Sequence, residues 1–196
     1  MKEKIYTIPV NEVFNTDCEC PMCALESKSE KETLEYALGP AMMEPDYRVL
    51  SNEKGYCKQH LESLLQMSEK LSLALTLDTY LAEINKNIDE FGKLKNKGNR
   101  GGIFKRDKKD SCEEFLEYLH KVNSGCVICD KIEYTMQRYM DVMIYMLQKE
   151  EDFKRKFTDS KGLCLKHFEQ ALRCAKENLS CSFHVGITLC TFCRIN

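Results

Sequence analysis

The sequence predicts a mainly α-helical fold on three observations. Its 196 residues include only 9 Gly and 4 Pro, few of the turn residues that an all-β protein needs. Charged residues make up 31% of the chain and hydrophobic residues 43%, a balance typical of helices with one solvated face. In the longest segments the apolar residues recur at steps of three and four, the period of an amphipathic helix.

In the first half of the chain we expect one extended segment and two helices. Ile5 to Phe14 is predicted to be extended, a short edge strand, because Ile5, Thr7 and Pro9 alternate. Residues 24–43 predict a helix that ends near Gly39-Pro40 or shortly beyond. Residues 58–91 predict a longer helix with a regular stripe of leucine and isoleucine.

In the second half we expect three helices, at about 111–122, 129–156 and 164–178. Ser111 is the expected cap of the first of them, and His120 on the same helix is expected at the surface rather than as a catalytic base. The middle helix carries methionines at helical spacing, which predict core more than a partner groove: Met136, Met140, Met143 and Met146.

A basic segment separates the two halves. From residue 93 to 109 it has eight basic residues, one acid and three glycines, a composition that cannot bury a core. The expected division is therefore a first helical module at 1–92, a linker at 93–110, a second module at 111–178 and an atypical tail at 179–196.

A pattern of cysteine and histidine occurs in both halves. Cys20-x-x-Cys23 recurs 106 residues later as Cys126-x-x-Cys129, and Lys-Gly-x-Cys57-x-x-His60 recurs 107 residues later around Cys164 and His167. This agreement predicts an internal duplication. The glycine in each second element, at 55 and 162, suits a tight turn with positive φ.

These residues predict metal binding. The N-terminus lacks the apolar core of a signal peptide, so we expect a reduced cytosol, where many cysteines indicate metal or redox chemistry rather than disulfides. Four thiolate and imidazole ligands are typical of structural zinc, and they leave no open position for a catalytic water. We expect two zinc ions, one on Cys20, Cys23, Cys57 and His60, the other on Cys126, Cys129, Cys164 and His167.

Other interpretations of the eight residues are buried cysteines beside ordinary histidines, thiol–disulfide chemistry, or an iron–sulfur cluster, which more often takes four cysteines. Four further cysteines fall outside the repeated pattern and are expected to be incidental: Cys18, Cys112, Cys174 and Cys181. Cys18 could also replace Cys20 as a ligand.

The tail has an unusual composition. From Asn178 to Asn196 the only charged residue is Arg194. An aberrant extension from a shifted or truncated reading frame is the favoured interpretation, and a packed hydrophobic tail is the second. The third is another zinc site, formed by Cys181, His184, Cys190 and Cys193.

The chain resembles a family of bacterial cytosolic proteins that has no assigned activity. The resemblance rests on the opening Ile-Tyr-Thr-Ile-Pro-Val, on Cys-Glu-Cys-Pro-Met-Cys and on the two Gly-x-Cys-x-x-His elements, and it covers residues 5 to about 177. It supports the fold, and it implies no activity.

The expected function is non-enzymatic. The sequence has no Ser-His-Asp order, Gly-rich phosphate loop or His-Glu-x-x-His, and no apolar run long enough for a membrane span. We therefore expect a cytoplasmic, zinc-stapled helical protein that binds another protein. The alternative is a redox or metal sensor based on zinc thiolates. A third hypothesis is weak, salt-dependent nucleic-acid binding through the basic linker, because the net charge of −2 gives no overall attraction.

Overall fold

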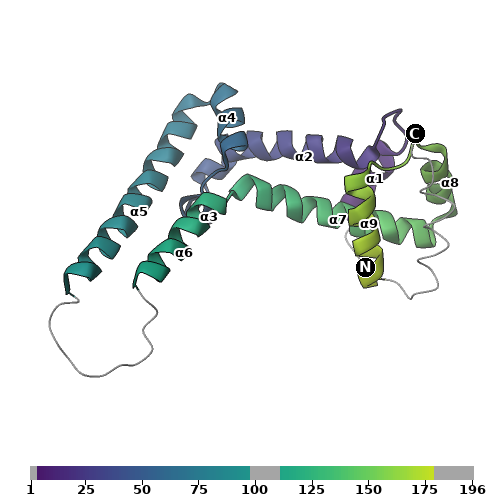
Figure 1. Ribbon diagram of the computed structural model, residues 1–196. Helices are drawn as coiled ribbons and strands as arrows, with labels where there is room; N and C mark the ends of the chain where they lie inside the picture. Colours follow the sequence, from purple (N-terminus) through teal and green to yellow (C-terminus); the bar gives the residue numbers. More distant parts are fainter. Residues whose placement is uncertain (1–3, 98–110, 179–196) are drawn as a thin grey trace. The chain divides into compact units, whose positions relative to one another are not determined.

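The computed structural model describes residues 4–97 and 111–178, and these stretches are helical without any strand, as predicted (Figure 1). The first half contains η1 (Lys4–Tyr6), α1 (Thr7–Val13), α2 (Pro21–Leu38), η2 (Pro40–Met43), α3 (Pro45–Lys54), α4 (Lys58–Gln66) and α5 (Lys70–Lys97). The second half contains α6 (Ser111–Ser124), α7 (Val127–Lys149), α8 (Glu151–Asp159) and α9 (Leu165–Asn178).

The prediction of an extended N-terminus is wrong, because this segment forms η1 and α1. Val10 is fully buried and Phe14 nearly so, and their spacing of four residues is that of one helix face. Pro9 lies in the first turn of α1, where a backbone N–H has no partner within the helix. The alternating residues share no common environment, since Ile5 is exposed whereas Thr7 and Pro9 are half-buried.

Both of the longest predicted helices are interrupted. The helix expected at 58–91 is α4 and α5, separated by an extended Met67 with ψ of 164°. The helix expected at 129–156 is α7 and α8, separated at Glu150, which has φ of −119° and ψ of 104°. Such short breaks leave the apolar period almost unchanged, so periodicity does not reveal them.

The other boundaries follow the sequence more closely. α2 ends at Leu38, just before Gly39-Pro40, and α6 and α9 begin and end within about two residues of their expected bounds. α3 was not predicted as a helix of its own. α5 continues to Lys97, so the first residues of the expected linker are helical, whereas its remainder at 98–110 lies outside the described residues.

The chain forms two compact units, and neither follows the expected division into 1–92 and 111–178. Unit 1 comprises residues 1–31 and 132–196, and unit 2 comprises residues 32–131. Each unit therefore takes segments from both halves of the sequence, and α2 and α7 each contribute one end to either unit.

The core of unit 1 forms where the end of α1 meets α8. The Phe14 ring lies 5.1 Å from the Phe153 ring and 5.4 Å from the Phe157 ring, centroid to centroid, and Phe153 and Phe157 are 1% exposed. The methionine stripe of α7 is also buried, which confirms the expectation of core: Met136, Met140, Met143 and Met146.

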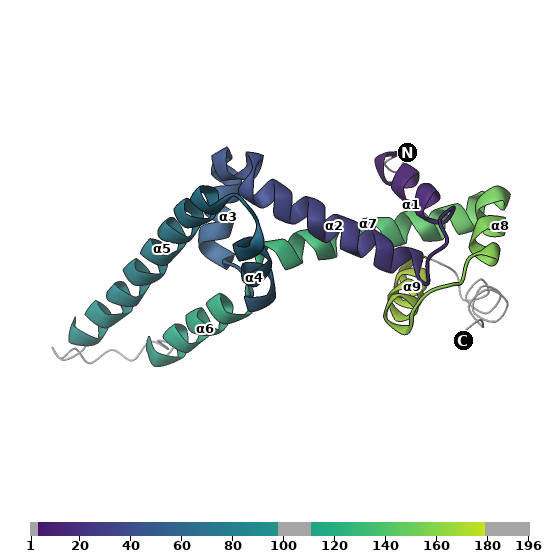
Figure 2. The same ribbon diagram turned by 90° about the horizontal axis from the view of Figure 1, so that it is seen from above.

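In unit 2 the short helix α3 packs against η2, α5 and α6, while α5 and α6 lie side by side (Figures 1 and 2). The Arg48 guanidinium of α3 donates hydrogen bonds to Thr76 Oγ1 at 2.9 Å and to Thr79 Oγ1 at 2.7 Å on α5. These charge-assisted bonds fix α3 on α5 and, with it, the turn that leads into the first Cys-x-x-His element.

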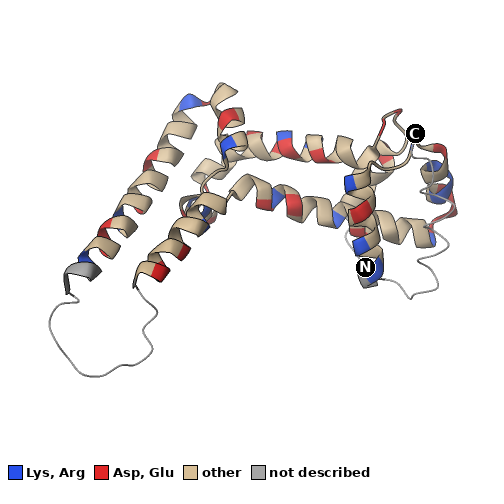
Figure 3. Ribbon diagram, in the orientation of Figure 1, with Lys and Arg blue, Asp and Glu red and all other residues tan. Residues whose placement is uncertain are grey.

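The helix surfaces carry charges of both signs, as Figure 3 shows along α5. In unit 2 these charges include ion pairs between Lys54 and Asp130 and between Lys121 and Glu53. Among the helices that the structure describes, none combines the length and apolar character that a membrane crossing requires.

Candidate metal centres

All eight predicted ligands lie in or just before the first turn of a helix. The two cysteine pairs open α2 and α7, and the two Cys-x-x-His elements open α4 and α9. Unpaired backbone N–H groups and the helix dipole both favour negative charge at this position, so it suits a thiolate.

The structure brings the eight residues together in two sets of four. The outer cluster, in unit 1, consists of Cys20, Cys23, Cys164 and His167; the inner cluster, in unit 2, consists of Cys57, His60, Cys126 and Cys129. We name them for the sequence, because the inner residues lie between the two parts of the outer set. Within each cluster the ligand atoms lie within 4.8 Å of one another.

The predicted pairing of the ligands is therefore wrong, although the eight residues are the expected ones. Each cysteine pair meets the Cys-x-x-His element of the other half of the chain, not that of its own half. The lengths of the intervening helices explain this pairing.

After Cys23 the chain leaves the cluster along α2, whose 18 residues extend about 27 Å. The 10 residues of α3 extend only about 15 Å, so α3 is too short to retrace the length of α2. The second half of the chain has the same difference in helix length, with 23 residues in α7 and 9 in α8.

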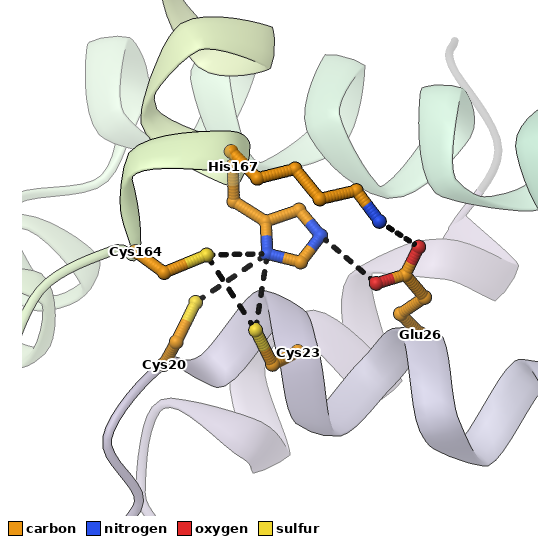
Figure 4. A network of polar contacts seen from close by, with 6 residues as sticks. Cys20, Cys23, Glu26, Cys164 and His167 are labelled. Atoms are coloured by element: carbon orange, nitrogen blue, oxygen red, sulfur yellow. Dashed lines mark hydrogen bonds and ion pairs between the residues drawn. The ribbon is translucent and has the colours of Figure 1, made fainter.

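In the outer cluster the three cysteine sulfurs lie close to His167 Nδ1 (Figure 4). The Sγ atoms of Cys23 and Cys164 both lie 3.3 Å from this nitrogen, and that of Cys20 lies at 3.5 Å. The Cys23 and Cys164 sulfurs are 3.6 Å apart.

The inner cluster has the same geometry. His60 Nδ1 lies 3.3 Å from the Sγ atoms of Cys57, Cys126 and Cys129. The Cys57 and Cys129 sulfurs are 3.8 Å apart, and the backbone N–H of Cys129 donates to Cys126 Sγ at 3.5 Å. Burial matches as well, since in both clusters the histidine and the first cysteine of the pair are buried and the second cysteine is exposed.

These distances fit one tetrahedral ion in each cluster. Metal–sulfur bonds of about 2.3 Å and metal–nitrogen bonds of about 2.0 Å give tetrahedron edges of about 3.8 Å between sulfurs and about 3.5 Å between sulfur and nitrogen. The observed contacts of 3.6–3.8 Å and 3.3–3.5 Å match both edges. An iron–sulfur cluster binds its ligands on separate iron atoms and so holds them further apart.

The thiols differ in acidity in the same way in both clusters. Burial, together with hydrogen bonds among the thiols, raises the pKa of Cys23 and of Cys129 to about 12. Burial also acts to raise the pKa of Cys57 and Cys164, but hydrogen bonds from backbone N–H groups and neighbouring thiols outweigh it and lower the pKa. A divalent cation would favour the thiolate form of all of them.

Both turns into the Cys-x-x-His elements use the left-handed region, as predicted, with φ of 62° at Gly55 and 89° at Gly162. At Gly55 the space is also restricted, because a Cβ would lie 2.3 Å from Tyr80 Cζ. The Gly55 carbonyl accepts a hydrogen bond of 3.1 Å from the backbone N–H of Val127, which joins the two ligand-bearing arms of the inner cluster.

One residue of the outer site was missed by the sequence analysis. Glu26 Oε2 lies 3.4 Å from His167 Nε2, and Glu26 Oε1 accepts a 2.6 Å hydrogen bond from Lys166 Nζ (Figure 4). Burial lowers the pKa of His167, which favours the neutral ring that a metal needs. Glu26 could have been found from its position, one helical turn after Cys23 on the same face of α2.

The other described cysteines and His120 belong to neither cluster. Cys18 accepts a 3.7 Å hydrogen bond from Thr16 Oγ1, Cys112 is exposed, and the buried Cys174 thiol donates to Asp141 Oδ1 at 3.2 Å. His120 is exposed, as predicted. The residues proposed for a third site, Cys181, His184, Cys190 and Cys193, lie outside the described residues.

Comparison with protein families identifies the family to which the chain belongs. The model of a family of unknown function (DUF6062) matches residues 1–185, a range that contains both clusters and the first part of the tail. The chain belongs to this family. No curated protein and no solved structure matches it.

Proposed function

We propose that the chain binds one structural zinc ion in each cluster and acts as a non-enzymatic helical protein that binds another protein in the cytosol. The observation that carries the proposal is that three sulfurs and one imidazole nitrogen lie within 4.8 Å of one another in both clusters. Such donor sets suit zinc, and four protein ligands are typical of a structural site. The matching construction of the two clusters supports an origin by duplication.

Metal analysis tests the zinc. Protein purified without chelator should carry two zinc ions per chain by native mass spectrometry and elemental analysis. Removal of both ions should lower helicity, because structural zinc sites in small peptides contribute about 10–16 kcal/mol of folding free energy at pH 7. A metal-free chain with full helicity in circular dichroism would refute the proposal.

Exposed leucines on α5 support the binding of a protein partner. Leu71 is 73% exposed and Leu81 54%, and Leu75 also reaches the solvent. The double substitution Leu71→Glu and Leu75→Glu should abolish a partner complex detected by cross-linking in cells, with helicity unchanged. Leu165→Glu on α9 is the matched control, since Leu165 is 68% exposed. An unchanged complex in the double variant would exclude this surface.

The exposed cysteines favour redox sensing as a second candidate. Cys23 and Cys129 are the most exposed ligands, and their sulfurs lie 3.6 and 3.8 Å from those of Cys164 and Cys57. Hydrogen peroxide would oxidise each pair to a disulfide, taking two electrons from the two thiols and forming two water molecules. Peptide mapping after peroxide should then show these two disulfides together with released zinc. Zinc retained by fully reduced protein under the same treatment would exclude this function.

A further inference from the structure

One cysteine of each cluster differs from the other two in its position on a helix. Cys23 is the third residue of α2, and Cys129 is the third residue of α7. The other four cysteines directly precede a helix: Cys20 before α2, Cys57 before α4, Cys126 before α7 and Cys164 before α9. A side chain in that position faces the free N–H groups of the first helical turn.

Backbone hydrogen bonds to the sulfurs follow this difference. Cys126 Sγ accepts a 3.5 Å hydrogen bond from a backbone N–H, and backbone N–H groups of the first turn also act on Cys57 and Cys164. A hydrogen bond from an N–H group stabilises the charge of a thiolate and so lowers its nucleophilicity. Cys23 and Cys129 lie one turn too far along their helices to be stabilised in this way.

Exposure to solvent separates the same two cysteines from the rest. Cys23 and Cys129 are exposed, whereas the other four cysteines of the clusters are half-buried or buried and both histidines are buried. A reagent in solution therefore reaches the four ligand atoms of either cluster most easily through the sulfur of Cys23 or Cys129.

A bound zinc ion would make these sulfurs nucleophiles. A coordinated cysteine is held as the thiolate, the reactive form of the side chain. Three thiolates and a neutral imidazole outweigh the charge of a divalent ion, so each occupied cluster would be negative overall, which favours attack on an electrophile.

We infer that Cys23 and Cys129 are the reactive thiolates of the two clusters, and that α,β-unsaturated carbonyl compounds modify them and release the bound ion. This inference rests on the proposed zinc function. A sulfur lone pair forms a bond to the β-carbon, the π electrons of the C=C bond move onto the carbonyl group as an enolate, and the enolate takes a proton from water. The product is a neutral thioether, a much weaker zinc ligand than a thiolate, so the ion keeps three protein ligands and dissociates.

N-ethylmaleimide tests the inference on the zinc-loaded, full-length chain. Peptide mapping after brief treatment should show Cys23 and Cys129 modified before the other four cluster cysteines, with Cys112 as the exposed thiol outside both clusters. A chromophoric zinc chelator should report the loss of one ion for each cluster modified. Earlier modification of the half-buried or buried cysteines would overturn the inference, as would zinc that stays bound after Cys23 and Cys129 have reacted.

Two variants assign the release to a cluster. Cys23→His replaces the reactive thiolate by another zinc ligand, and Cys129→His makes the same change in the inner cluster. With N-ethylmaleimide, Cys23→His should lose only the inner ion and Cys129→His only the outer ion. Loss of both ions from either variant would contradict the assignment, and the mapping of wild-type protein does not depend on them. Wild-type protein that binds no metal would instead refute the proposed function itself.

Discussion

The outer and inner clusters have the same ligands and the same burial, but they close very different lengths of chain. Cys23 and Cys164 of the outer cluster are 141 residues apart in sequence, whereas the corresponding His60 and Cys126 of the inner cluster are 66 apart. The entropic cost of closing a loop grows by about 0.6 kcal/mol for each doubling of its length. Closing the outer site therefore costs about 0.7 kcal/mol more than closing the inner site. The comparison teaches that identical donors do not imply equal affinity.

Two effects therefore oppose one another. The longer loop disfavours the outer ion by about threefold, while a carboxylate behind the histidine is worth about 10–100-fold in affinity. At the outer cluster Glu26, which lies 3.4 Å from His167 Nε2, should therefore more than offset the longer loop. Each ion should also strengthen the other by about threefold, because either closure shortens the chain that the other must close.

Loss of one ligand gives the largest expected effect and tests this balance directly. Cys57→Ser should lose the inner ion, and Cys164→Ser the outer ion. Adding Glu26→Gln to Cys57→Ser should weaken the remaining outer ion by about 10–100-fold in competition with a chelator. Equal retention of the outer ion with and without Glu26→Gln would show that the carboxylate does not support His167.

Cleavage of the chain between residues 98 and 110 tests the exchange of ligands between the halves. Each cluster takes two of its residues from either side of this segment, so an ion bound in either cluster would join the two pieces. A chain with an inserted protease site there should, after cleavage, elute as one species in size-exclusion chromatography. Addition of chelator should separate the pieces, with uncleaved protein as the control. Pieces that part while two zinc ions remain bound would contradict the observed pairing.

The two turn glycines give the smallest expected effect. Both have positive φ, so alanine is strained at either position, by about 1 kcal/mol. At Gly55 the new Cβ would also meet the Tyr80 ring, whereas at Gly162 the structure leaves open space. Gly55→Ala should therefore destabilise the protein by about 1–3 kcal/mol more than Gly162→Ala in thermal unfolding. Equal losses would mean that Tyr80 moves aside freely.

The sequence was sufficient to identify the eight residues of the two clusters but not to pair them. Local spacing places Cys20 and Cys23 in one cluster, because two intervening residues put both sulfurs on one side. Which Cys-x-x-His element completes the set depends on the lengths of the intervening helices, which the spacing of the motifs does not reveal. The helix breaks at Met67 and Glu150 were missed for a related reason, since the apolar period continues across them.

The hydrogen bond from the Val127 N–H to the Gly55 carbonyl should make the two clusters assemble at different rates. It aligns the two arms of the inner cluster through main-chain atoms alone. The outer cluster has Pro21 at the position that corresponds to Val127, and proline has no N–H to donate. We therefore expect the inner cluster to capture an incoming ion first. The outer cluster should then fill second.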